Sequence, residues 1–352
     1  MDDQKPISRH QQKKANREAI LMDAKKPLTE GELARLERMK RSVQNRRGRK
    51  QPSVMPAKLA RTSAFAPRRK GLITDSNFMR VYEVPGYSVV EVRGRELGSQ
   101  HRDAIYALFR LPRAKISMPN PSYKPRTFTA PTISCYETRT TWRELLKVMG
   151  KGEHVNNLLS LLNTFQEIQQ VSLTIHQGSS IEELEKIRKS RAAGVLPDTA
   201  GSASPIIKEL SWDGAQLDSG ITVQYGTSVL EMIEKAYLVS INAEVQFRLK
   251  SDHAKTFWPF IDSQPNHSYI DEERLAHLAG RSLWAEDMTS AHRAQFRKEC
   301  REAFNDMRMA GGLREWREEV TGSGRNKSRR YHYVHASPRQ LEMDLIKTVS
   351  QG

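Results

Sequence analysis

The segment from residue 288 to residue 337 constrains the fold most, because its pattern changes from helical to extended around one basic loop. Strands are predicted over residues 312–320 and 331–336, and the loop between them, 321–330, is rich in Gly, Arg and Lys. A helix is predicted before them, over residues 289–309, from apolar side chains at helical spacing: Phe296, Cys300, Ala303, Met307 and Ala310. A long helix followed by a two-stranded hairpin is typical of a winged helix.

A row of guanidinium groups follows one flank of this helix, where Arg293, Arg297 and Arg301 recur every four residues. Arg can form paired hydrogen bonds with guanine or phosphate, and Asn can do the same with adenine. We therefore predict DNA contacts at Ser290, His292, Arg293, Arg297, Lys298, Arg301 and Asn305 on the helix, and at Arg325, Asn326, Lys327, Arg329 and Arg330 on the loop. The alternative for the helix is an ordinary solvated surface of Arg and Lys, some of which pair with Glu299, Glu302 and Asp306.

The positive charge is concentrated at the start of the chain. Residues 1–71 contain 20 Lys and Arg against 7 Asp and Glu, a net of +13 out of the +16 of the 352-residue chain. A basic arm of this kind, largely disordered by its composition, is expected to bind a polyanion, nucleic acid before an anionic membrane surface. No apolar run approaches the ~20 residues of a spanning helix, and no signal peptide is recognisable, so a cytoplasmic protein without membrane contact is expected.

The first half of the chain shows the same kinds of element. Strands are expected over residues 78–84, 87–92, 132–140, 171–176, 206–212 and 220–225, and helices over 96–111, 142–149, 153–169 and 227–235. The helix over 153–169 is expected to turn Val155, Leu158, Leu159, Leu162 and Phe165 inward and to expose amides and a hydroxyl. Those outward polar groups could read base edges, but an ordinary solvated face is the commoner explanation.

A second unit repeats this order after residue 236. We expect a strand over 243–249, helices over 251–261 and 271–279, and then the Arg-bearing helix and its hairpin. The predicted fold class is therefore α+β, with two tandem winged-helix domains and a basic N-terminal arm. The expected boundaries are 1–71 for the arm, 72–235 for the first domain with an insertion at about 179–205, 236–338 for the second domain, and 339–352 for a C-terminal tail.

No pattern predicts catalysis, a metal site or a cofactor. The loop that contains Lys327 and Ser328 lies between two strands, whereas a nucleotide-binding P-loop must lead into a helix. His332 and His335 are three positions apart on a predicted strand, so they lie on opposite faces and are assigned structural roles. The two cysteines, Cys135 and Cys300, fit packing rather than a disulfide. A non-enzymatic protein is expected.

Three scattered motifs over about residues 60–335 resemble the replication initiator proteins of broad-host-range plasmids, the TrfA type in particular. They are Ala60 to Phe65 followed by Arg68-Arg69-Lys70, Glu91 to Leu97 before a helix, and Trp142 to Gly150 after a strand. The resemblance implies two winged-helix domains that bind directly repeated origin DNA, open the neighbouring AT-rich duplex and recruit the host initiator and replicative helicase. It also implies a monomer–dimer equilibrium in which monomers bind the origin. By position, residues 289–309 correspond to the recognition helix and 321–330 to the second wing.

These observations predict a plasmid replication initiator that binds repeated sequences in double-stranded DNA. Two alternatives stay open. One is a winged-helix transcriptional repressor without origin-opening activity, and the other is a structural or RNA-packaging protein that uses the basic arm.

Overall fold

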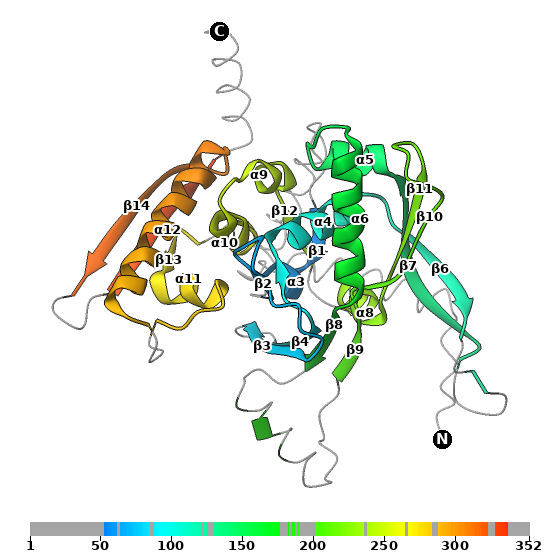
Figure 1. Ribbon diagram of the computed structural model, residues 1–352. Helices are drawn as coiled ribbons and strands as arrows, with labels where there is room; N and C mark the ends of the chain where they lie inside the picture. The colour runs from blue at the N-terminus through cyan, green and yellow to red at the C-terminus, as the bar shows by residue number, and fades with distance from the viewer. Residues whose placement is uncertain are drawn as a thin grey trace, which may run out of the picture. The chain divides into compact units, whose positions relative to one another are not determined.

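The computed structural model describes residues 53–336, with gaps at 62–63, 85–87, 121–122, 125–129, 177–181, 183–184, 187–188, 190–200, 236–237, 265–266, 284–287 and 323–327. The described part is a mixed α+β fold of helices and small sheets (Figure 1). Most of the predicted basic arm and the whole C-terminal tail lie outside the described residues.

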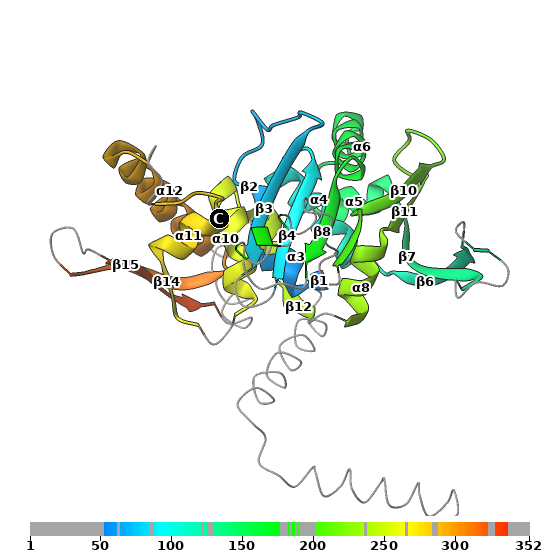
Figure 2. The same ribbon diagram turned by 90° about the horizontal axis from the view of Figure 1, so that it is seen from below.

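The described part of the first half contains two four-stranded antiparallel sheets (Figures 1 and 2). Its helices include α4 (Ser99–Arg110), α5 (Trp142–Val148) and α6 (Val155–Gln169). One sheet has the order β10-β11-β7-β6, from β6 (Ala114–Pro119), β7 (Thr132–Thr141), β10 (Ile207–Trp212) and β11 (Gly220–Tyr225). The other has the order β3-β4-β8-β9, from β3 (Phe78–Val84), β4 (Ser88–Gly94), β8 (Ser172–His176) and β9 (Gly201–Pro205).

The second half begins after α8 (Thr227–Lys235) and β12 (Leu238–Ile241). Its helices are α9 (Ala243–Arg248), α10 (Asp252–Asp262), α11 (Glu272–Leu278) and α12 (Ser290–Met309). Its sheet has the order β13-β15-β14, from β13 (Tyr269–Asp271), β14 (Leu313–Thr321) and β15 (Ser328–His335). In this sheet Tyr331 pairs with Ile270 on one side and with Glu318 on the other.

Both halves end in a hairpin that pairs with an earlier strand in the same way. In each half a strand precedes two helices and then pairs with the second strand of a terminal hairpin, β7 with β11 in the first half and β13 with β15 in the second. The first strand of each hairpin, β10 or β14, forms the outer edge on that side. Among the described residues both halves thus share a strand, two helices and a hairpin, whereas the strand expected to open the second unit at 243–249 is a helix and β13 takes that place.

A strap made of β1 (Ser53–Pro56), α3 (Ala57–Arg61) and β2 (Phe65–Ala66) joins the two halves. Strand β1 pairs with β12, and β2 pairs with β5 (Leu97–Gly98) beside α4. Met55, Leu59 and Phe65 are at most 3% exposed. The predicted arm boundary at residue 71 is therefore wrong, because the strap belongs to the core. Its few apolar residues lie among basic ones, and composition alone did not separate them from the arm.

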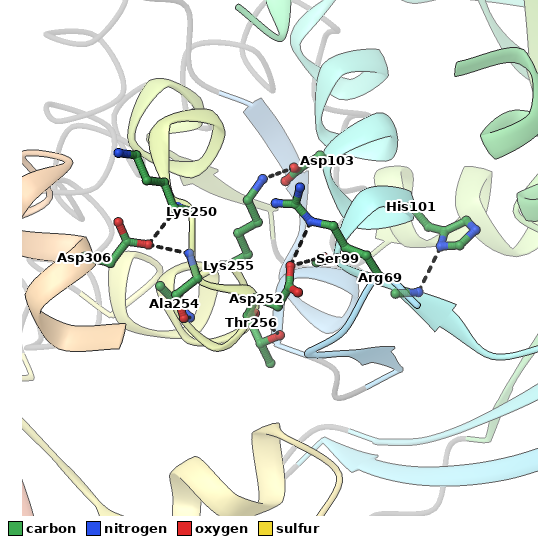
Figure 3. Close-up of polar contacts among 12 residues, drawn as sticks. Arg69, Ser99, His101, Asp103, Lys250, Asp252, Ala254, Lys255, Thr256 and Asp306 are labelled. Atoms are coloured by element: carbon green, nitrogen blue, oxygen red, sulfur yellow. Dashed lines mark hydrogen bonds and ion pairs between the residues drawn. The ribbon is translucent and has the colours of Figure 1, made fainter. Parts of the chain in front are cut away.

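Buried polar contacts join α4 to α10 directly (Figure 3). Asp103 forms an ion pair with Lys255 and accepts a hydrogen bond from Gln246 Nε2 at 3.0 Å. Arg102 Nη1 donates to the carbonyl oxygen of Thr256 at 2.9 Å. Because these groups are 10% exposed or less, the halves are linked by a specific polar interface as well as by the chain.

Three predicted segments differ from the structure. Residues 243–249 form α9 and not a strand, since Asn242 accepts from the Val245 amide and caps a helix that buries Ala243, Val245 and Gln246. Residues 112–131, whose prolines predict an extended connection, contain β6, which pairs with β7. The end of the predicted insertion forms β9, which pairs with β8, and most of the remainder lies outside the described residues.

Candidate nucleic-acid interface

Helix α12 forms where the sequence predicts it and buries the predicted stripe. The hydroxyl of Thr289 accepts from the His292 amide at 3.2 Å and caps the first turn. The side chains that pack inward are Phe296, Cys300, Ala303, Phe304 and Met307, each 0% exposed. Burial raises the pKa of the Cys300 thiol, so this thiol is a packing group and not a nucleophile.

The predicted arginine row does not face outward along its whole length. A helix has 3.6 residues per turn, so an interval of four advances about 40° around the axis at each step. Arg293, at the start of the row, donates to the carbonyl oxygen of Met288 at 3.0 and 3.2 Å. Arg297 donates to both oxygens of Glu272 at 2.7 and 3.5 Å. The first two members of the row therefore have partners within the protein.

Arg301 lies further round the helix and is more accessible. Its Nη1 lies 3.3 Å from Glu318 Oε2 on β14, and its side chain is 43% exposed. The predicted alternative, in which nearby acids pair with the cations of the helix, is correct in part: Glu302 lies 4.0 Å from Lys298, whereas Arg297 and Arg301 pair with acids from outside the helix. Asp306 instead accepts from the backbone amides of Lys250 and Ser251, both at 2.7 Å (Figure 3).

The outward row of α12 follows a spacing of four, three, four and three. It consists of Ala294, Lys298, Arg301, Asn305 and Arg308, all exposed or half-buried. Lys298 is 66% exposed and lies 4.0 Å from Glu302, a surface pair that stabilises little and exchanges easily. Trp316 Nε1 donates to Asn305 Oδ1 at 3.1 Å and orients that amide. Arg308 belongs to this row but is not among the predicted contacts.

The predicted wing residues divide into two groups. Arg329 and Arg330 lie on β15, which begins three residues earlier than expected. Arg329 contacts Glu318 at 2.5 Å and Glu272 at 3.8 Å, and Arg330 contacts Asp271 at 3.0 Å. The other predicted contacts on the loop, at Arg325, Asn326 and Lys327, lie outside the described residues and stay predictions.

Strand β14 and helix α12 lie side by side and run in opposite directions (Figure 1). The helix spans about 30 Å at 1.5 Å per residue, and the nine residues of β14 span a similar length. The Arg301–Glu318 contact joins the middle of α12 to the second half of β14, so Thr321, the last residue of β14, lies toward the N-terminal half of α12. The exposed helix residues Ser290, His292 and Lys298 belong to that half.

Helix α6, the positional counterpart of α12 in the first half, has an uncharged outer face. Its buried residues are Leu158, Leu161, Thr164, Phe165 and Ile168. Val155 and Leu159 are 52% and 45% exposed, so their predicted inward position is wrong. The inward stripe follows intervals of three and four that begin at Leu158, and residues 155 and 159 fall on the opposite side.

Other chemistry is limited within the described part of the chain. No group of three or more His, Cys, Asp or Glu side chains there could hold a metal ion. His332 lies 2.5 Å from Glu319 on the neighbouring strand. None of the described helices is long and apolar enough to cross a bilayer.

Comparison with known proteins gives likenesses of structure only. No protein-family model and no curated protein matches the chain. The crystal structure of RctB domains 2–3 is similar at 10% identity, with a TM-score of 0.45 and coverage of 81% of this chain and 99% of that chain. Selenomethionine derivatives of RctB domains 2 and 3 give 11% identity, a TM-score of 0.49 and coverage of 80% and 99%. The Pi initiator protein in complex with iteron DNA gives 10% identity, a TM-score of 0.44 and coverage of 69% and 92%. At these values the likenesses do not decide the function of this chain.

Proposed function

We propose that the protein is a cytoplasmic, non-enzymatic replication initiator of the TrfA type that binds repeated origin sequences in double-stranded DNA. Each half is then a winged-helix domain, with α5 and α6 before the β10–β11 hairpin and α11 and α12 before the β14–β15 hairpin. Duplex opening, recruitment of the host initiator and helicase, and a monomer–dimer equilibrium belong to the same proposal.

The outward row of α12 carries this proposal. It presents Lys298, Arg301 and Asn305 on one face of a 20-residue helix beside a hairpin. A helix fits the major groove, where Arg and Asn pair with base edges while Lys contacts phosphate. The backbone amides at the start of the helix also point toward the hairpin end and favour an anion there.

The motifs that carry the family resemblance have a structural role in this chain. Arg61 donates to the side chain and the carbonyl oxygen of Ser263 at 2.9 and 3.1 Å. Glu96 is 1% exposed and pairs with Arg68, and Trp142 is fully buried at the start of α5. These residues hold elements together, so the resemblance supports the scaffold of an initiator, while DNA recognition depends on the less distinctive surface of α12.

Footprinting on the DNA that flanks the protein's own gene tests the proposal. A protected set of direct repeats is the expected result. On a duplex with one repeat, Lys298→Ala is expected to lower the slope of log K against log salt by about one, because one phosphate contact is lost. Lys250→Ala, at an exposed lysine outside both the basic arm and the outward row of α12, is the matched control and is expected to leave the slope unchanged.

Two results would contradict parts of the proposal. Equal affinity for the repeat and for its scrambled version would exclude sequence-specific binding. Thymines beside the repeats that stay unreactive to permanganate in the bound complex would exclude duplex opening and favour the repressor.

A further inference from the structure

Five charged side chains form a continuous network between α12 and the hairpin. Glu272, the first residue of α11, and Glu318, on β14, are the two acids. Three arginines contact them: Arg297 and Arg301 from α12, and Arg329 from β15. Arg329 contacts both acids, so the network joins the helix to both strands of the hairpin. We call these five residues the Arg–Glu network.

One end of the Arg–Glu network is fixed. The Glu272 side chain is only 7% exposed, and both of its oxygens accept from Arg297. Separating this pair would leave a carboxylate desolvated, which is costly. Arg297 is therefore an anchor for α12 and is not available to DNA.

The other end can exchange partners. Arg301 contacts Glu318 through one nitrogen at 3.3 Å, and its side chain is 43% exposed and lies in the outward row of α12. Glu318 is 18% exposed, and a single-contact pair with a partly exposed arginine contributes little to stability. The remaining oxygen of Glu318 is held by Arg329 at 2.5 Å, so the carboxylate stays in place when Arg301 leaves. The geometry thus gives Arg301 two alternative partners, Glu318 or a group on DNA.

We propose that Glu318 is a specificity-determining residue, because it keeps Arg301 neutralised on non-cognate DNA and releases it only to a cognate site. This inference rests on the proposed function. An ion pair with a single phosphate is no more favourable for Arg301 than its existing ion pair with Glu318. The Glu318 carboxylate also repels phosphates within a Debye length of about 8–10 Å. A guanine edge offers two parallel hydrogen bonds, so only the cognate site compensates for the exchange.

The salt dependence of binding distinguishes this mechanism from a general effect of charge. On non-cognate DNA, Glu318→Gln is expected to free Arg301 for one more phosphate and to steepen the slope of log K against log salt by about 0.9. On the footprinted repeat the slope is expected to stay nearly the same, because Arg301 already contacts DNA there. The ratio of cognate to scrambled affinity therefore falls in this variant.

Glu315→Gln is the matched control, because it removes the same charge from the same strand. Glu315 is 61% exposed and contacts Arg314, outside the Arg–Glu network. An equal change of slope in both variants would overturn the proposal in favour of bulk electrostatics, and so would an unchanged slope in Glu318→Gln. A wild-type protein that binds neither duplex would instead refute the proposed function itself.

Arg301→Met tests the same exchange from the other side if Glu318→Gln does not fold. The side chain is partly exposed, so the substitution is expected to preserve the fold. Weaker binding to the repeat with an unchanged slope on scrambled DNA supports the proposal. Equal losses on both duplexes would show that Arg301 contacts phosphate everywhere, and would overturn it.

Discussion

Replacing Lys255 by Met is expected to destabilise the protein strongly, because it breaks the buried pair between the halves. The Lys255 and Asp103 side chains are 5% and 10% exposed. After the substitution, the carboxylate of Asp103 keeps the hydrogen bond from Gln246 at 3.0 Å but loses the ammonium group that contacts it directly. Removing one partner of a buried pair costs roughly 3–5 kcal/mol, which is a factor of several hundred or more in the folding equilibrium.

Urea unfolding measures this cost, followed by tryptophan fluorescence and by far-ultraviolet circular dichroism. Trp258 lies on α10 less than one turn from Lys255, so the fluorescence reports on the interface. The double variant Asp103→Leu/Lys255→Met removes both charges and is expected to recover most of the loss. Lys70→Met, at an exposed position, is the control and should change stability by less than about 0.5 kcal/mol.

Two outcomes would refute this reasoning. A loss below about 1 kcal/mol in Lys255→Met would mean that water reaches the pair as it reaches a surface pair. A double variant no more stable than the single one would mean that Lys255 acts through packing of its aliphatic stem and not through its charge.

Two further predictions concern stability. Arg297→Ala is expected to lower the free energy of unfolding by about 2 kcal/mol, because it leaves the buried Glu272 with Arg329 as a weaker partner. Arg308 has no side-chain partner among the described residues, so Arg308→Ala should change the free energy of unfolding by less than about 0.5 kcal/mol. Equal urea midpoints for the two variants would contradict this prediction. Burial lowers the pKa of His101, although its Nε2 lies 2.7 Å from Glu167. The neutral imidazole therefore contributes to the stability of the folded state above about pH 6.5, and this stability is lost as pH falls toward the folded-state pKa. Urea midpoints between about pH 7.5 and 5 should therefore fall less steeply in His101→Gln than in the wild type, and parallel curves would show that His101 does not contribute.

Elements with a strong local pattern could be predicted from the sequence. Strands β3 and β11 and helix α8 have the predicted bounds, and α12 starts one residue after its predicted start, with Thr289 as its cap. Alternation of apolar residues and helix-capping hydroxyls are local signals, so they need no tertiary context. The sequence pattern does not predict the three-residue strand β13 or the strap, because their elements are short and are stabilised by segments far away in sequence.

The candidate site could be predicted only in part, for a related reason. Periodicity placed the arginines on one flank of α12 but could not show which groups lie opposite. Glu272 is 25 positions from Arg297 and Glu318 is 17 positions from Arg301, and only the packing of α11 and β14 brings them close. That packing is why Arg297 of the predicted row is an anchor and why we propose that Arg301 exchanges partners.

The strap limits how the protein can be divided for study. A fragment that starts at residue 72 would lose β1, α3 and β2 and would leave solvent in the space that Met55 and Phe65 fill. A fragment that starts at residue 236 would keep β12 as an unprotected edge, ready to pair with a neighbouring molecule. Either half expressed alone would therefore tend to aggregate, and grafting the strap onto each fragment is the rational route to soluble halves.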